Sequence, residues 1–211
     1  MIKKNLKTLI ITSLIILIPM FAGLFLWNVL PDTMPMHWNI NGEVDGWVSK
    51  PVAIFGMPLA MIAFQWLCTF ITGTDPKNKN ITKKSMDLVL WIIPCITLML
   101  GTITYLAALN YPISVDIIMP AFFGVFFIVV GNYLPKCKQS HTIGIKLPWT
   151  LESEDNWNKT HRFAGKLWVI CGLLILILSF LGNIYIMMGV TLVMVLIPAI
   201  YSYLLYKKST K

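Results

Sequence analysis

The run TLIITSLIILIPMFAGLFLWNVL, residues 8–30, decides the fold class. It contains no charged residue and exceeds the roughly 20 apolar residues that a helix needs to cross a bilayer. Lys3, Lys4 and Lys7 precede it, as in a signal peptide. However, the apolar core of a signal peptide is only about 7–15 residues long. We therefore expect a retained first transmembrane helix.

Five further stretches of similar length and apolarity follow, at residues 51–72, 87–109, 115–134, 164–182 and 184–206. The whole chain is 57% hydrophobic and only 12% charged, whereas a soluble domain carries about 25% charged residues. This composition excludes an ordinary soluble enzyme domain, a disordered tail and a secreted disulfide scaffold. It predicts an all-α membrane protein, a bundle of six transmembrane helices. We expect one integral membrane domain over residues 1–211, with an ordered external loop at 31–50 and a structured cytoplasmic loop at 135–163.

The charges alternate from one polar segment to the next. The segment after the first span carries Asp32, Glu43 and Asp45 against only Lys50. The other basic residues lie at the two termini and in the segments after the second and fourth spans: Lys3, Lys4, Lys7, Lys77, Lys79, Lys83, Lys84, Lys136, Lys138, Lys146, Lys159, Arg162, Lys166, Lys207, Lys208 and Lys211. The positive-inside rule makes that side cytoplasmic. We expect both termini in the cytoplasm, and the net charge of +8 needs no nucleic-acid partner.

No Asp, Glu, Lys, Arg or His lies near the middle of any of these spans. Ion-coupled transporters and proton pumps usually carry such residues, so this pattern argues against that class. The polar residues that remain are expected to form interhelical hydrogen bonds: Gln65, Thr97, Thr102 and Ser179. Small residues are expected at close helix contacts: Gly23, Gly56, Gly101, Gly124, Gly172 and Gly189. The cysteines show no CxxC or Cys/His spacing, so no disulfide or zinc site is expected.

The external loop combines turn residues with aromatic and acidic side chains. Asn41-Gly42 is a turn dipeptide, and the flanking residues 36–39 and 45–48 predict a short hairpin. One interpretation is an ordered lid whose Trp38 and Trp47 anchor at the lipid headgroups. The other is a recognition surface whose acids attract a cationic partner. The candidate binding residues are Asp32, His37, Trp38, Asn39, Glu43, Asp45, Trp47 and Lys50.

The cytoplasmic loop has the features of a helix that starts on the membrane surface. Ser153 or Thr150 is a suitable N-cap, and acids precede bases along the following residues, as the helix dipole favours. Asp155 and Lys159 form a favourable i,i+4 pair. Trp157, His161, Ala164 and Trp168 share one face. We expect a helix that bends or runs into the fifth span, and a loop that can dock another protein.

These two loops carry a family resemblance. Residues 144–151, GIKLPWTL, together with Trp157 and Thr160-His161-Arg162, resemble the signature of the SdpI family of bacterial membrane proteins. Residues 31–50, with His37-Trp38-Asn39, Gly42, Asp45 and Ser49-Lys50, are similar to the N-terminal domain found with it. The resemblance implies a six-span protein of the bacterial inner membrane that gives immunity to a secreted, amphipathic killing peptide. It also implies recruitment of a cytoplasmic ArsR-type repressor.

Three positions depart from the family pattern. The chain has Lys146 where the family usually has Arg, Leu147 where it has Thr, and Ser140 where it often has Asn. Lysine keeps the charge but loses the bidentate fork of a guanidinium group, so a contact to a carboxylate or phosphate would be weaker here. The residues that the resemblance implies for cytoplasmic docking are Lys146, Pro148, Trp149, Thr150, Trp157, His161 and Arg162.

Two other functions remain open on the sequence. One is a membrane-embedded enzyme or small transporter with a polar or metal site at a loop mouth, carried by His37 with Asp45, or by His141 with Glu152 and Glu154. The other is an assembly factor without a small ligand. No HExxH or GxSxG motif and no catalytic carboxylate pair is present. We therefore expect an immunity protein, not an enzyme, with no cofactor and no bound metal.

Overall fold

The computed structural model describes residues 2–209, without the side chains of residues 2 and 3. Lys211 and the side chain of Lys3, which contributed to the charge pattern, lie outside this description. The chain packs as two compact units, Met1–Gly73 with Met86–Val115, and Thr74–Ser85 with Asp116–Lys211. Each unit is described by itself. A single domain over residues 1–211 stays a prediction.

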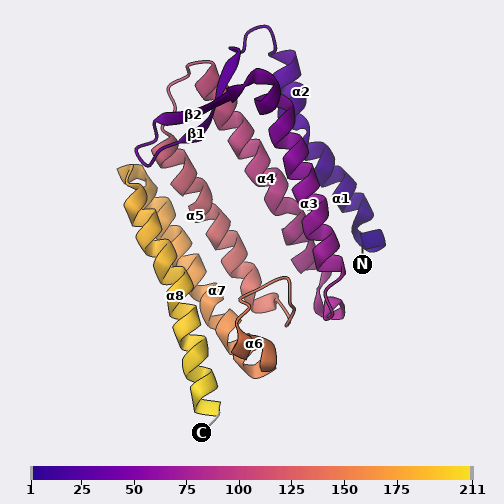
Figure 1. The fold of residues 1–211 in the computed structure, drawn as a ribbon. Helices are drawn as coiled ribbons and strands as arrows, with labels where there is room; N and C mark the ends of the chain where they lie inside the picture. The colour runs from indigo at the N-terminus through magenta and orange to yellow at the C-terminus, as the bar shows by residue number, and fades with distance from the viewer. Residues whose placement is uncertain (1, 210–211) are drawn as a thin grey trace. The chain divides into compact units, whose positions relative to one another are not determined.

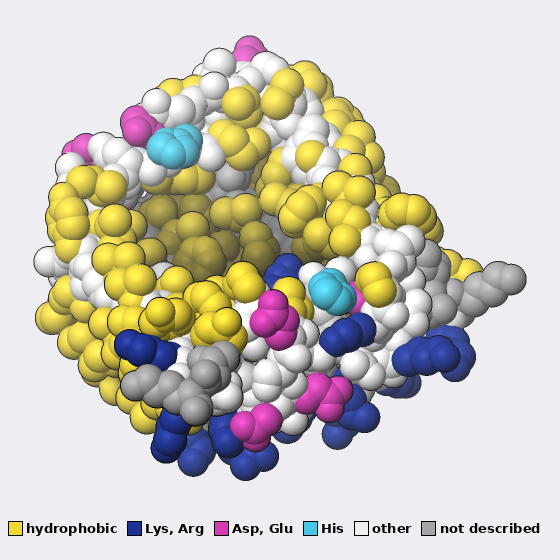
Figure 2. All heavy atoms as spheres, turned by 60° about the horizontal axis from the view of Figure 1, so that its bottom comes forward, with side chains coloured by type: hydrophobic (Ala, Val, Ile, Leu, Met, Phe, Trp, Pro, Cys, Tyr) yellow, Lys and Arg dark blue, Asp and Glu magenta, His cyan; other side chains and the backbone are white. Residues whose placement is uncertain are grey.

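Within residues 2–209, six helical stretches are long and apolar enough to cross a membrane. They are Lys4–Phe25, Val52–Gly73, Lys83–Ala108, Val115–Lys136, Glu154–Leu181 and Ile184–Ser209. This confirms the all-α class and the number of spans. Figure 2 shows hydrophobic side chains over much of the visible face, with Lys and Arg side chains gathered in its lower part. That surface suits a lipid environment, because lipid tails solvate apolar side chains.

The first span is not one straight helix. It divides at Leu17 into α1 (Ile2–Ile16) and α2 (Ile18–Phe25). Pro19 lies in the first turn of α2, where its missing N–H is tolerated. The helix ends at Phe25 instead of the predicted Leu30, and turns follow. The second span begins with the π-helical turn η1 (Val52–Gly56) and continues as α3 (Met57–Gly73); α4 (Lys83–Ala108) is the third.

A buried amide joins three helices of the first unit. The Nε2 atom of Gln65 on α3 donates to Thr12 Oγ1 of α1 at 2.6 Å and to the carbonyl oxygen of Leu90 on α4 at 3.1 Å. The interhelical prediction for Gln65 is confirmed. It is wrong for Thr97, Thr102 and Ser179, whose hydroxyls donate to carbonyl groups of their own helical turns. A hydroxyl that donates to a carbonyl group of its own helix is satisfied without a partner on a neighbouring helix.

A two-stranded antiparallel hairpin connects α2 to the second span (Figure 1). Strand β1 covers Thr33–Trp38 and strand β2 covers Val44–Ser49. Thr33 pairs with Ser49 and Trp38 pairs with Val44, with register irregularities on either side of His37. The predicted hairpin is confirmed. Met34 is fully buried in a core cluster with Leu30, Ile54, Tyr105 and Ala108, so apolar packing fixes one face of the hairpin.

The second unit contains α5 (Val115–Tyr133), α7 (Glu154–Leu178) and α8 (Ile184–Ser209) as its long helices (Figure 1). Shorter turns are η2 (Asn78–Asn80), η3 (Leu134–Lys136), α6 (Pro148–Glu152) and η4 (Ser179–Leu181). Gly182 has φ +59° and ends η4 before α8 begins. The side chain of Ser153 accepts the N–H of Asn156 and caps α7. The helix runs unbroken from this cap into the fifth span, which settles the choice between bending and continuing.

Helices α5 and α7 approach closely at two pairs of glycines. A Cβ atom on Gly124 would lie 2.9 Å from the carbonyl oxygen of Gly172, and one on Gly131 would lie 2.9 Å from that of Gly165. These contacts confirm the prediction for Gly124 and Gly172. The same prediction is wrong for Gly189, where a Cβ atom would have no described atom within 4 Å, and for Gly56, where it would meet only a residue of its own helical turn.

Candidate functional site

Of the eight residues predicted for external recognition, all but Asp32 and Lys50 lie in the hairpin, and these two directly flank it. Its turn is organised by Asn39. The Oδ1 atom of Asn39 accepts the backbone N–H groups of Asn41 and Glu43 at 2.9 and 3.1 Å, and its Nδ2 donates to the Glu43 carboxylate at 3.0 Å. Gly42 adopts φ +78°, which glycine tolerates best. The Asn39 side chain is therefore committed to the turn.

Lys50 is also a structural residue. It is only 8% exposed, and its Nζ donates to the carbonyl oxygen of Trp27 at 3.1 Å. The same Nζ lies 3.3 Å from the Asp32 carboxylate and 5.3 Å from the Trp27 ring centroid. These contacts fasten the end of β2 to the end of the first span. The ammonium group has little surface left for a ligand.

The exposed face of the hairpin is acidic and aromatic. The Trp47 side chain is 59% exposed, whereas Trp38 is half-buried. Asp32, Glu43 and Asp45 are exposed. Asp45 Oδ1 lies 2.5 Å from His37 Nδ1, which orients that carboxylate beside the strand. The structure thus brings Trp47 together with carboxylates on an open surface.

In the second unit, Trp157 and His161 are buried and bond to backbone groups of the 135–163 segment. Trp157 is fully buried, and its Nε1 donates to the carbonyl oxygen of Cys137 at 2.8 Å. The rings of Trp157 and His161 stack at 4.0 Å. His161 Nε2 accepts the N–H of Ile145 at 2.8 Å, and its Nδ1 lies 2.8 Å from the carbonyl oxygen of Trp157. This pattern requires the neutral imidazole with its proton on Nδ1.

A second set of contacts joins this segment to residues 74–85. The buried Asp75 carboxylate accepts the N–H groups of Lys77 and His141 at 2.7 and 2.9 Å, and the Thr142 hydroxyl at 2.7 Å. Burial acts to raise the pKa of Asp75, but the three hydrogen bonds and the nearby His141 outweigh it and hold the pKa below its ordinary value. Asp75 is therefore a charged acceptor that ties two loops together.

Gln139 completes this connection. Its Nε2 donates to the carbonyl oxygens of Thr150 and Leu151 at 2.8 and 2.9 Å, and its Oε1 accepts from Lys77 Nζ. We call Asp75, Gln139, Gly144, Trp157 and His161 the loop cluster. The four side chains of the loop cluster bond to backbone groups of several segments, and Gly144 packs against Trp157 and His161, so the cluster fixes the shape of the surface around it.

The residues predicted for cytoplasmic docking divide into two groups. Lys146, Pro148 and Arg162 are exposed. Thr150, Trp157 and His161 are buried and hold the segment together. Trp149 is half-buried and stacks against Tyr203 and Tyr206 of α8. The predicted pair of Asp155 and Lys159 is confirmed, with 2.6 Å between Lys159 Nζ and Asp155 Oδ2.

The metal alternative needs several ligating side chains gathered in one place. Across residues 2–209, no three His, Cys, Asp or Glu side chains gather as a metal site would need. Among those residues, His37 and Asp45 form a pair without a third ligand.

Sequence reasoning missed Asp75, Gln139 and a buried polar group between α7 and α8. In that group, Asn156 Nδ2 donates to the carbonyl oxygen of Ser202 at 3.0 Å, and the hydroxyls of Ser202 and Thr160 donate to Asn156 Oδ1 at 2.9 Å. These residues form no motif along the chain. The only available signal was an Asn and a Thr on the apolar face that Trp157 and His161 define.

Comparison with known proteins finds two matching family models and one curated relative. Residues 136–202 match the model of the SdpI/YfhL protein family, and residues 14–62 match a domain of unknown function (DUF1648). The chain is 32% identical over 213 aligned positions to "Immunity protein SdpI" of Bacillus subtilis (strain 168), covering 98% of this chain and 97% of that relative. This chain belongs to the SdpI/YfhL family. No solved structure matches it. The two matched regions contain the hairpin and most of the loop cluster.

Proposed function

We propose that this chain is an integral membrane immunity protein that protects its cell against a secreted antimicrobial peptide. The observation that carries the proposal is the near full-length similarity to a protein named for immunity. The six helices long enough to span a membrane put the chain in the bilayer, where a membrane-active peptide acts. The family assignment suggests a role in binding or blocking such a peptide, with no chemical step required.

The hairpin is the part of the chain best suited to meet the peptide. Residues 31–50 contain three carboxylates against one lysine, a net charge of −2 with His37 neutral. That lysine is buried and committed to Trp27 and Asp32. A cationic peptide would be attracted by the carboxylates, and exposed Trp47 would supply apolar contact. We therefore assign recognition chiefly to Trp47, Asp45 and Glu43.

The orientation follows from the distribution of basic residues. The positive-inside rule puts both termini and the loop cluster in the cytoplasm, and the acidic hairpin outside. In a bacterial inner membrane this exposes the hairpin to a secreted peptide.

The cytoplasmic surface around the loop cluster is proposed to dock a repressor of the ArsR type, as the resemblance to the SdpI family implies. Lys146, Pro148 and Arg162 are the exposed members of the predicted set. Replacing Lys146 and Arg162 with Glu is expected to abolish co-sedimentation of the repressor with membranes while peptide resistance stays. Unchanged co-sedimentation would refute this docking surface.

Survival of a sensitive bacterial strain tests the immunity function. The strain lacks its own immunity gene, expresses this chain, and is titrated with purified killing peptide. We expect the killing curve to shift to higher peptide concentration. Trp47→Ala combined with Asp45→Asn is expected to reverse most of the shift, because contact and charge attraction are both lost.

The matched control is Trp91→Ala, which removes a tryptophan that is 43% exposed on α4, away from the hairpin sequence. It should retain full resistance. Membrane levels of every variant are measured by immunoblotting. If the inserted wild-type chain gives no shift with several killing peptides, the immunity proposal is refuted. If wild type protects and the hairpin variant protects equally, the function stands and the assignment to the hairpin is wrong.

A further inference from the structure

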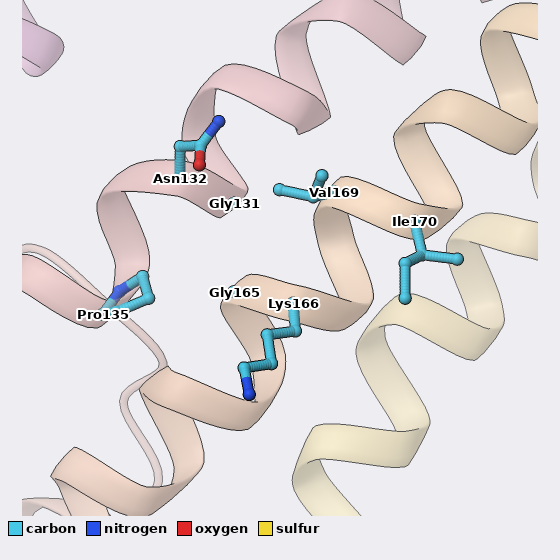
Figure 3. Close-up of a pocket in the computed structure, with 7 residues that line it drawn as sticks. All are labelled: Gly131, Asn132, Pro135, Gly165, Lys166, Val169 and Ile170. Atoms are coloured by element: carbon cyan, nitrogen blue, oxygen red, sulfur yellow. The ribbon is translucent and has the colours of Figure 1, made fainter.

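A groove of about 380 Å³ lies between α5 and α7 of the second unit, near the end of the fourth span (Figure 3). Its floor contains Gly131 and Gly165, and its walls include Pro135, Val169 and Ile170. A Cβ atom on Gly165 would lie 2.6 Å from Pro135 Cγ and 2.7 Å from the Gly131 carbonyl oxygen. The glycines therefore bring the two backbones together and leave the groove open beside them.

Two polar side chains lie at this groove, Asn132 and Lys166. Both are exposed, and no ion pair or hydrogen bond between described residues uses either side chain. Figure 3 shows the Lys166 side chain extending away from Val169 and Ile170, toward the start of α7. A lysine near the end of an apolar span extends its ammonium group toward the headgroup level in this way.

The combination of an apolar wall with a lysine ammonium group selects the occupant. The side chain of Ile170 is 64% exposed, so a bound molecule must offer apolar surface as well as negative charge. A free anion such as inorganic phosphate offers only the charge. Basic pockets between transmembrane helices are suited to the headgroups of acidic lipids.

We propose that this groove binds one acidic phospholipid. The lipid phosphate accepts from Lys166 Nζ at the end of the groove near the start of α7, and an acyl chain lies along Val169 and Ile170. A zwitterionic lipid carries its own cation next to the phosphate, which opposes the ammonium group of Lys166. The groove therefore prefers a phospholipid with net negative charge. This inference concerns a lipid site and does not depend on the immunity function.

Native mass spectrometry of the purified, delipidated full chain in detergent tests the proposal. Phosphatidylglycerol and phosphatidylcholine are titrated separately, and bound lipids are counted. We expect one phosphatidylglycerol to bind more tightly than the rest and than phosphatidylcholine. Lys166→Gln should weaken that lipid about fivefold, the contribution of one basic residue near an acidic membrane surface. Val169→Phe should weaken it without a change of charge, because the larger ring fills the groove.

Lys208→Gln is the matched control, because it removes an exposed positive charge of the second unit that lies outside the groove lining. It should leave phosphatidylglycerol binding unchanged, and circular dichroism shows whether each variant is folded. Equal binding by Lys166→Gln and wild type overturns the proposal, as does equal binding of the two lipids. If Val169→Phe has no effect and millimolar phosphate displaces the lipid, the site recognises phosphate alone, and the lipid groove is wrong.

Discussion

The packing of the loop cluster depends on Gly144, which has no side chain. Its φ of +121° and its contacts both exclude a side chain, since a Cβ atom would lie 2.5 Å from His161 Nε2 and 2.7 Å from Trp157. We expect Gly144→Ala to destabilise the folded chain by about 1–3 kcal/mol. The measurement is the midpoint of thermal unfolding in detergent.

Gly189→Ala is the matched control for Gly144→Ala, because a Cβ atom at Gly189 would point into open space, with no described atom beyond its own helical turn and chain neighbours within 4 Å. Alanine favours a helix over glycine by about 1 kcal/mol, so this variant should be as stable as wild type or slightly more stable. Equal midpoints for the two variants would contradict the packing described around Gly144.

Asp75 gives the loop cluster a dependence on pH. Its pKa in the folded chain is lowered, so the stability that it contributes is present above the unfolded pKa of about 3.9. That contribution is lost as the pH falls through the lower folded pKa. Asp75→Asn should cost about 1–3 kcal/mol near neutral pH, because it removes a charged acceptor of three hydrogen bonds. The difference from wild type should shrink below about pH 4.

Denaturant unfolding at a series of pH values measures this difference. Glu152→Gln serves as the control, because it neutralises an exposed carboxylate nearby in the same segment. Its effect should be small at every pH. A gap between wild type and Asp75→Asn that stays constant down to about pH 3 would show that the ionised carboxylate is not the stabilising form.

Single residues were predictable where a periodic pattern identified them. The spacing of Trp157, His161 and Ala164 predicted a shared face, and all three are buried. Asp75 and Gln139 were not predictable, because each bonds to backbone groups of a distant segment. Lys50 was predicted to contact a ligand. Its Nζ instead donates to the carbonyl oxygen of Trp27, which is 23 positions away along the chain. No local sequence pattern indicates such a contact.

At the scale of elements, local rules worked well for the hairpin and for α7. Asn41-Gly42 predicted the turn, and Ser153 predicted the helix start; both are present. The signal for the break at Leu17 is Pro19, because a proline inside an apolar span tends to kink its helix. An apolar run continues through the break, and hydropathy alone does not distinguish helix from turn.

The glycine contacts between α5 and α7 make a prediction at the same scale. Gly172→Val would put three carbon atoms where a single Cβ already comes within 2.7 Å of the Gly124 carbonyl oxygen. We expect a loss of about 1–3 kcal/mol, the usual cost of overpacking. Unfolding in a denaturant series measures the loss, with Gly189→Val as the unpacked control. Similar losses for both variants would show that valine itself, instead of the contact, is responsible.

For the whole molecule, the orientation of the six spans is the property that most needs a direct test. A chain with its four cysteines replaced by alanine accepts single cysteines at exposed Asn41 or Lys79. In intact cells, a membrane-impermeant maleimide should label Asn41→Cys and leave Lys79→Cys unlabelled. Permeabilised cells should show labelling at both positions. The reverse pattern in intact cells would invert the proposed topology.

The number of spans was predictable from the whole chain, because length and apolarity are enough to define a span. The division into two compact units was not, since each unit joins segments that are separated in the chain. Residues 74–85 belong with residues 116–211. Asp75 and Gln139, which sequence patterns did not reveal, form hydrogen bonds between these two segments.

The two glycine pairs also restrict how α5 and α7 can move. Gly124 meets Gly172 and Gly131 meets Gly165. The two glycines therefore have the same spacing on both helices, and the two helices run antiparallel. Sliding one helix by a single turn, about 5.4 Å, would bring side-chain carbons against backbone at both contacts. Tilting about either contact requires no such collision. Any rearrangement of this pair is therefore expected to proceed as a pivot at fixed register and not as a translation.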